Sequence, residues 1–128
     1  MGTPRFVPAR IFANPRDFGR NSLAELVVDS DLSPVEAAWA WYQHRACLMV
    51  FDRLFYRGLT MNDFARGMGA DLAWTTRKLH GQTPVSLGDL LEWSIHLGVS
   101  IFPADEAVTD LLVPGGALLP GRECVGNR

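Results

Sequence analysis

The segment of residues 59–99 reads LTMNDFARGMGADLAWTTRKLHGQTPVSLGDLLEWSIHLGV and predicts three short amphipathic helices in succession. Apolar residues recur at helical spacing in each, and Thr60, Asp71 and Ser86 stand where N-cap residues are preferred. Gly69, between the first two helices, permits the positive φ of a tight turn. The pattern therefore predicts a helix-turn-helix motif over residues 60–80, with helices over 61–68 and 72–80, followed by a helix over 87–97.

This order of features resembles the Cro and lambda-repressor-like (XRE) family over residues 59–99 of the 128-residue chain. The matching features are the stripe of Phe64, Ala65 and Met68, the Leu79-His80-Gly81 that is similar to the family's Leu-Asn-Gly, and residues 86–99, which are similar to its SLxxLLxxAxxLGV helix. The resemblance implies an all-α fold, a lambda-repressor-like bundle of about five helices. It also implies a transcriptional regulator that binds specific double-stranded DNA as a homodimer. No cofactor is expected.

A long first helix is predicted immediately before the motif. Residues 33–36, Ser-Pro-Val-Glu, combine an N-cap serine, a proline at the first helical position and a glutamate at the third, and no glycine or proline follows until Gly58. The apolar residues of this helix exceed what one packed face needs, with the surplus around Trp39, Trp41 and Tyr42. That surplus predicts a subunit interface; the alternative is that the N-terminal arm folds back and covers it.

Residues outside the motif and the long helix complete the predicted domain organisation. Residues 1–32 contain prolines at 4, 8 and 15 and no period, which predicts an extended N-terminal arm with a short helical turn from Ser22. The arm either pairs or follows a DNA groove, or it touches nothing. The helix-turn-helix domain spans 33–112, with a last helix over 104–112, and the glycine- and proline-rich residues 113–128 predict a flexible tail.

Charge is distributed unevenly along the chain. The formal net charge of −2 is unfavourable for a DNA-binding protein, because phosphate neutralisation supplies most non-specific affinity. However, residues 37–81 carry six cationic and three acidic side chains, residues 1–22 carry four arginines and one aspartate, and residues 82–110 carry five acids and no cation. The motif and the arm are therefore the regions where DNA contacts are expected.

The predicted recognition helix, residues 72–80, supplies the candidate DNA contacts. If Thr75 and Leu79 form its inner side, the residues facing the bases are Leu72, Ala73, Thr76 and Arg77. Arg77 is the strongest of these, because its guanidinium fork matches the paired acceptors of guanine. The candidates for phosphate contacts are Arg57, Arg66, Lys78 and His80.

The same helix is also compatible with a function of a different class. Related DNA readers carry polar residues where this chain has Met61, Leu72, Ala73 and Trp74. An outward face of Met61, Leu72 and Trp74 is typical of a protein-binding surface, since Trp and Met are enriched at interfaces. The alternative function is therefore a protein-interaction module, such as an accessory factor or an antitoxin-like subunit that binds another regulatory protein; Trp74 packing into the core is the third reading.

Other functional classes find little support in the sequence. His44 and Cys47 are three residues apart on the long helix, but no second pair has ligand spacing, so no metal site is expected. The chain has no GxSxG, no phosphate-cradling glycine loop and no distinct carboxylate pair, so we do not expect an enzyme. Two distant cysteines, no signal-like N-terminus and no apolar run of membrane length predict a soluble cytoplasmic protein without a membrane partner.

Overall fold

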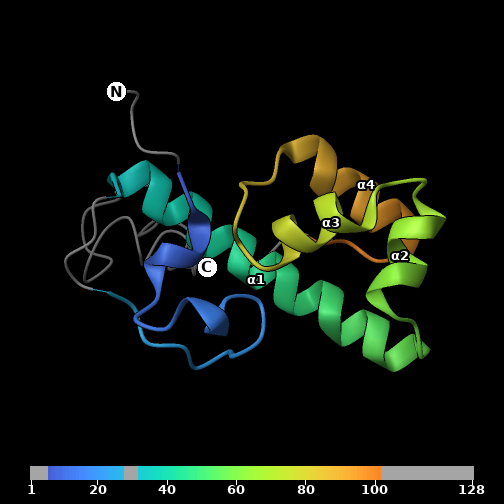
Figure 1. Ribbon diagram of the computed structural model, residues 1–128, viewed down its shortest axis with the longest axis horizontal. Coiled ribbons are helices and arrows are strands. Elements are labelled where there is room, and N and C mark those ends of the chain that lie inside the picture. Colours follow the sequence, from blue (N-terminus) through green and yellow to red (C-terminus); the bar gives the residue numbers. More distant parts are fainter. Residues whose placement is uncertain (1–5, 28–31, 102–128) are drawn as a thin grey trace, which may run out of the picture.

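A computed structural model describes residues 6–27 and 32–101 of the chain (Figure 1). Its elements are the 3-10 helices η1 (Pro8–Ile11) and η2 (Pro15–Asp17) and the α-helices α1 (Pro34–Arg57), α2 (Met61–Gly67), α3 (Leu72–Leu79) and α4 (Leu87–Leu97). No strand occurs in these two ranges, only an isolated antiparallel bridge between Phe12 and Leu26. The all-α fold class is confirmed; the predicted helix over 104–112 and the tail over 113–128 lie outside the described residues.

The long helix α1 begins and ends where the sequence predicts. Ser33 and Glu36 form a capping box, Pro34 occupies the first turn, and Gly58 ends the helix in the left-handed region at φ 67°. In Figure 1, α1 crosses the molecule, with the N-terminal segment on the left and α2, α3 and α4 on the right. α1 is therefore the element against which the other parts of the fold are placed.

One hydrophobic core joins the N-terminal segment to all four α-helices. Its buried residues are Ala9, Ile11, Phe12, Phe18, Ala40, Ala46, Cys47, Val50, Leu54, Phe64, Leu79, Val85, Leu90, Trp93, Leu97 and Ile101. Burying a large apolar side chain stabilises the folded state by about 1.5 to 3 kcal/mol relative to leaving it exposed. The residues that the sequence assigns to an arm therefore contribute to the stability of the bundle.

The prediction of an extended arm is wrong for residues 8–18. Pro8 and Pro15 open η1 and η2 because proline presets the φ of a first helical residue, and Phe12 and Phe18 are buried. The helical turn predicted after Ser22 is also absent from residues 22–27. There the Asn21 carboxamide oxygen accepts a hydrogen bond from the Leu23 N–H at 2.9 Å, which favours a turn over a helix.

The folded N-terminal segment covers part of the apolar surplus of α1. Phe6 packs on Trp39 with ring centroids 5.1 Å apart, and Phe12 packs on Trp41 at 6.3 Å. Trp41 and Tyr42 are half-buried, whereas Trp39 keeps 42% of its surface exposed although its Nε1–H donates to the Val85 carbonyl at 2.9 Å. Among the described residues, Trp41 therefore shows the alternative arrangement, in which the N-terminal segment folds back and covers the apolar surface of α1.

Candidate nucleic-acid interface

The helices α2 and α3 are joined by a short turn. A capping box of Thr60 and Asp63 opens α2, and the hydrogen bond from the Thr60 N–H holds the pKa of the Asp63 carboxyl below its ordinary value. After α2, Gly69 adopts a φ of 68°, as the tight turn requires. The predicted cap of α3 is wrong in one respect: Asp71 has the extended backbone of an N-cap, but its side chain makes no capping hydrogen bond.

One side of α3 packs into the molecule and the other faces outward. Thr75, Lys78 and Leu79 are buried, and the burial predicted for Thr75 and Leu79 is confirmed. The exposed residues of this helix are Leu72, Ala73, Trp74 and Arg77, while Thr76 and His80 are half-buried. Three of the four base-reading candidates, Leu72, Ala73 and Arg77, thus lie on the exposed side.

Thr76, the fourth base-reading candidate, is engaged within the motif. Its Oγ1 lies 2.7 Å from the Leu72 carbonyl oxygen and 3.0 Å from the sulfur of half-buried Met61. Since a hydroxyl carries one proton, Thr76 can donate to only one of these atoms at a time. Both contacts direct the hydroxyl proton toward α2 or α3. Toward a group outside the protein, Thr76 can therefore act chiefly as a hydrogen-bond acceptor.

Lys78 is not the surface cation that the phosphate prediction required. Its ammonium lies 2.7 Å from the Asp89 carboxylate and 4.5 Å from the centroid of the Trp74 ring. The other Asp89 oxygen accepts a hydrogen bond from the Ser86 N–H at 2.8 Å, within the capping box of α4. Lys78 therefore joins α3 to the start of α4, because positions 75, 78 and 79 share one side of the helix.

The other phosphate candidates occupy different surroundings. Arg66 is exposed near the end of α2, and Arg57 is exposed at the end of α1, where its guanidinium lies 3.5 Å from the Leu97 carbonyl. His80 sits between Arg20 and Phe51, whose ring stacks on it with centroids 6.0 Å apart. Burial and the Arg20 charge lower the pKa of His80. His80 is therefore a neutral imidazole near neutral pH.

Gln43 is a positioning residue that the sequence analysis did not identify. It is fully buried in α1; its side-chain amide donates to the carbonyls of Lys78 and Thr83 at 2.8 and 2.9 Å, and its oxygen accepts from the Val85 N–H at 2.9 Å. These three bonds fix the backbone that follows α3. A glutamine among the apolar residues of a long helix was the available signal, since buried polar groups are nearly always hydrogen-bonded.

One exposed cation, Arg77, and two large apolar side chains share the outer surface of α3. The Arg77 guanidinium lies 5.6 Å from the centroid of Trp74, within the range of a cation–π contact. Trp74 and Leu72 expose 46% and 41% of their surfaces. The surface therefore combines one bidentate hydrogen-bonding group with a flat apolar patch.

His44 and Cys47, the two residues with ligand spacing on the long helix, are both buried in α1. The Nδ1 of His44 accepts a hydrogen bond from the Gly19 N–H at 2.8 Å, and burial raises the pKa of the Cys47 thiol. Within residues 6–27 and 32–101, no three His, Cys, Asp or Glu side chains gather in a way that would hold a metal ion. In the same ranges, no helix combines the length and apolarity needed to cross a membrane.

Comparison with protein-family models, with curated proteins and with solved structures found no match in any of the three.

Proposed function

We propose that this protein is a sequence-specific DNA-binding transcriptional regulator that reads double-stranded DNA with α3, in the manner of the Cro and lambda-repressor-like family. The observation that carries the proposal is the division of α3, which is anchored by buried Thr75 and Leu79 and turns Arg77 outward beside α2. An α-helix with its side chains is about 10 to 12 Å wide, which fits a DNA major groove of about 12 Å. The exposed cations of α2 and α3 supply the matching charge.

The candidate residues divide into those that contact bases and those that contact phosphates. Arg77 reads guanine through its two-pronged hydrogen bonding, and Leu72 and Ala73 contact thymine methyl groups. Arg66 and Arg57, both exposed, bind phosphates of the DNA backbone. Lys78 has no phosphate role, because Asp89 already binds its ammonium; it instead fixes the angle between α3 and α4.

The test is selection of fragments from mixed genomic DNA over a series of salt concentrations, with Arg77→Ala and Arg66→Ala as a matched pair. Each variant removes one exposed arginine. We expect Arg77→Ala to cost about 1 to 3 kcal/mol of discrimination at one base position, whereas Arg66→Ala weakens all fragments alike and lowers the salt slope by about 1. Equal selectivity in the wild type and Arg77→Ala would contradict base reading by α3.

A protein-interaction module is the second candidate, and the exposure of Leu72 and Trp74 favours it. Large apolar side chains on the outward side of a helix are more typical of a protein-binding surface than of a DNA-reading one. The two candidates differ in the same experiment. A protein-interaction module binds no fragment selectively at any salt concentration, and Trp74→Ala would then be the variant that loses its partner.

We propose that the homodimer forms through an apolar surface on α1 and α4. Val35, Trp39 and Leu87 line one pocket, and Leu91 and Ile95 continue from Leu87 along α4 at intervals of four residues. Between 42% and 76% of each of these five side chains is exposed. A second copy that covers this surface would present two α3 helices to a two-fold DNA site.

A further inference from the structure

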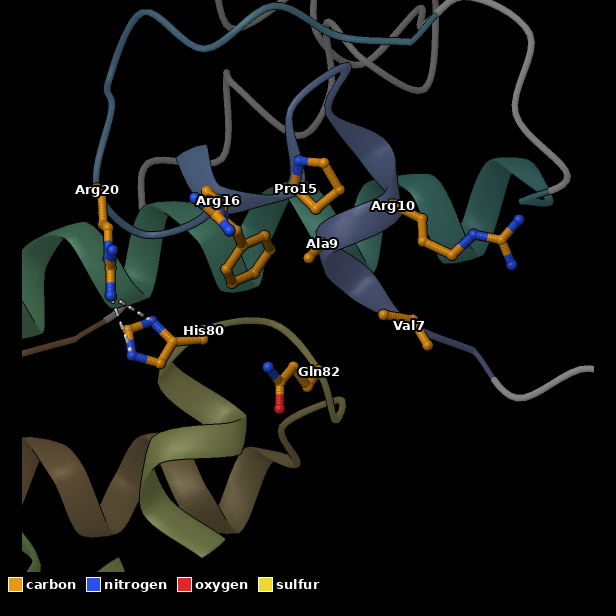
Figure 2. A pocket seen from close by; sticks show the side chains of 9 residues that line it. Val7, Ala9, Arg10, Pro15, Arg16, Arg20, His80 and Gln82 are labelled. Carbon is orange, nitrogen blue, oxygen red and sulfur yellow. Dashed lines mark hydrogen bonds between the residues drawn. The ribbon is translucent and has the colours of Figure 1, made fainter. Parts of the chain in front are cut away.

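A basic pocket lies between the N-terminal segment and the end of α3 (Figure 2). Its volume is about 440 Å³, within the range of small-molecule sites. Its polar lining consists of Arg10, Arg16, Arg20, His80 and Gln82, and its apolar lining includes Phe18. Figure 2 shows Arg20 facing His80, Gln82 rising from the loop after α3, and Arg10 turned away at the other end. Arg16 and Arg20 are both exposed and can adjust to a ligand.

The walls of this pocket are held in place by close backbone packing. The Ala9 N–H donates to the Gly81 carbonyl at 2.8 Å, which ties η1 to the loop after α3. Gly81 has a φ of 74°, and a Cβ there would lie 2.6 Å from the Phe18 ring. Gly19 has a φ of 72°, and a Cβ there would lie 2.9 Å from the Leu79 carbonyl oxygen. The two walls of the pocket therefore meet in close contact at glycines where a larger residue would be strained and would displace its neighbours.

No acidic side chain lines the pocket beside Arg16 and Arg20 among the described residues. Asp17 follows Arg16 in sequence but lies outside the lining. The Arg20 guanidinium lies 3.2 and 3.3 Å from the two ring nitrogens of His80. A neutral imidazole has one acceptor nitrogen, so this contact uses at most one of the several N–H donors of Arg20. The remaining donors of Arg20 are available to an anion.

We propose that this pocket binds a phosphate group through the guanidinium groups of Arg16 and Arg20, with the Gln82 amide as a third donor. Guanidinium forks match the oxygens of phosphate, and such charge-assisted bonds are stronger than neutral ones. Two sources share this chemistry: the backbone of DNA bound along α3, which rests on the proposed function, and a free phosphorylated small molecule, which does not. In either case the ligand links the N-terminal segment to the end of α3.

The first arm of the test titrates the full chain with inorganic phosphate at constant ionic strength, followed by NMR of the side-chain N–H groups. We expect saturable shifts at Arg16, Arg20 and Gln82. The double variant Arg16→Ala/Arg20→Ala should lose affinity by about tenfold or more, the loss expected for hydrogen bonds to charged groups. The control Arg45→Ala/Arg53→Ala removes the same charge from α1, at residues outside the lining of the pocket, and should retain the shifts. The absence of saturable shifts, or an equal loss in both double variants, overturns the proposal.

The second arm measures DNA affinity against salt concentration and identifies the source of the phosphate. If DNA supplies it, Arg16→Ala/Arg20→Ala lowers the salt slope by about 0.9 for each phosphate that the arginines no longer neutralise, without changing which fragments are selected. If the slope is unchanged while phosphate binding is confirmed, the ligand is a free phosphorylated molecule. Failure of the proposed function has a different signature: Arg77→Ala leaves selectivity unchanged, whatever the phosphate titration gives.

Discussion

At the scale of single residues, Gln43 determines where the backbone after α3 runs. Its side chain satisfies the carbonyls of Lys78 and Thr83 and the N–H of Val85, and it is fully buried. A buried backbone group that loses its partner costs about 1 to 3 kcal/mol, so this one side chain affects the stability of the fold strongly. It also sets the position of the end of α3, and hence the surface that carries Arg77.

We expect Gln43→Leu to lower the free energy of unfolding by about 2 to 4 kcal/mol, because it leaves several buried polar groups unpaired in a site of similar volume. Urea denaturation followed by circular dichroism measures the change. The control is Gln82→Leu at an exposed position, where the effect should stay within about 0.5 kcal/mol. Comparable losses in the two variants would show that the three bonds of Gln43 contribute little.

His44 makes stability depend on pH. Burial lowers its pKa from 6.5 to about 4, the Arg45 charge adds to this, and the Asp17 charge opposes it. The folded state disfavours the protonated ring. The contribution of His44 to the free energy of unfolding is therefore fully present above pH 6.5 and falls by about 3 kcal/mol as the pH drops to about 4. We therefore expect the urea midpoint to fall over this interval.

The variant that tests this is His44→Asn, whose amide oxygen can replace Nδ1 as the acceptor for the Gly19 N–H. This variant should reduce the steepness with which the urea midpoint changes between about pH 4 and pH 6.5. His96→Asn changes an exposed histidine on α4 and should leave the steepness as in the wild type. If His44→Asn also leaves it unchanged, His44 is not the group responsible.

At the scale of elements, the beginnings of the helices were predictable because their signals are local. Ser33, Thr60 and Ser86 each form a capping box with the residue three positions later, and each was expected to begin a helix. Asp71 carries the same type of signal but makes no side-chain bond, since the identity of a residue does not fix its rotamer. Sequence therefore located α3 without describing how its first turn is stabilised.

This difference predicts unequal effects for two similar substitutions. Thr60→Ala removes a side-chain bond to the Asp63 N–H at 3.0 Å and should lower the free energy of unfolding by about 1 kcal/mol. Asp71→Ala removes no capping bond and should cost clearly less, since only the interaction of its charge with the helix dipole disappears. Urea denaturation at neutral pH compares them directly. A larger loss for Asp71→Ala would indicate that its side chain caps α3 in solution.

The N-terminal segment was not predictable because its structure depends on contacts that are distant in sequence. The Ala9 N–H donates to the Gly81 carbonyl, and the Gly19 N–H donates to His44. The backbone at both positions is therefore held by residues far away in the sequence. Lys78 was missed for a related reason: its spacing placed it on the inner side of α3, but its charge suggested the surface. Only its pairing with Asp89 of α4 makes the buried position favourable.

At the scale of the whole molecule, the described residues have two surfaces of opposite chemistry. Arginines from the N-terminal segment, α2 and α3 are exposed, and the apolar residues Val35, Trp39, Leu87, Leu91 and Ile95 are exposed on α1 and α4. Exposed apolar residues in an unbroken group commonly mark a contact with another protein. Under the proposed function, the basic surface binds DNA and the apolar surface binds a second copy.

The last prediction concerns the state of assembly. Leu91→Glu and Ile95→Glu place charges on the exposed side of α4, where they do not disturb the core, so the circular dichroism spectrum should stay unchanged. If a second copy covers this surface, sedimentation velocity should show a dimer for the wild type and a monomer for each variant, because burying an unpaired carboxylate costs several kcal/mol. Leu23→Glu, at a residue that is 88% exposed in the N-terminal segment, is the matched control and should remain dimeric. A wild type that is monomeric at every concentration would contradict the homodimer, and a dimer that both α4 variants retain would place the second copy on another surface. Either result would separate the apolar surface from the reading of a two-fold DNA site.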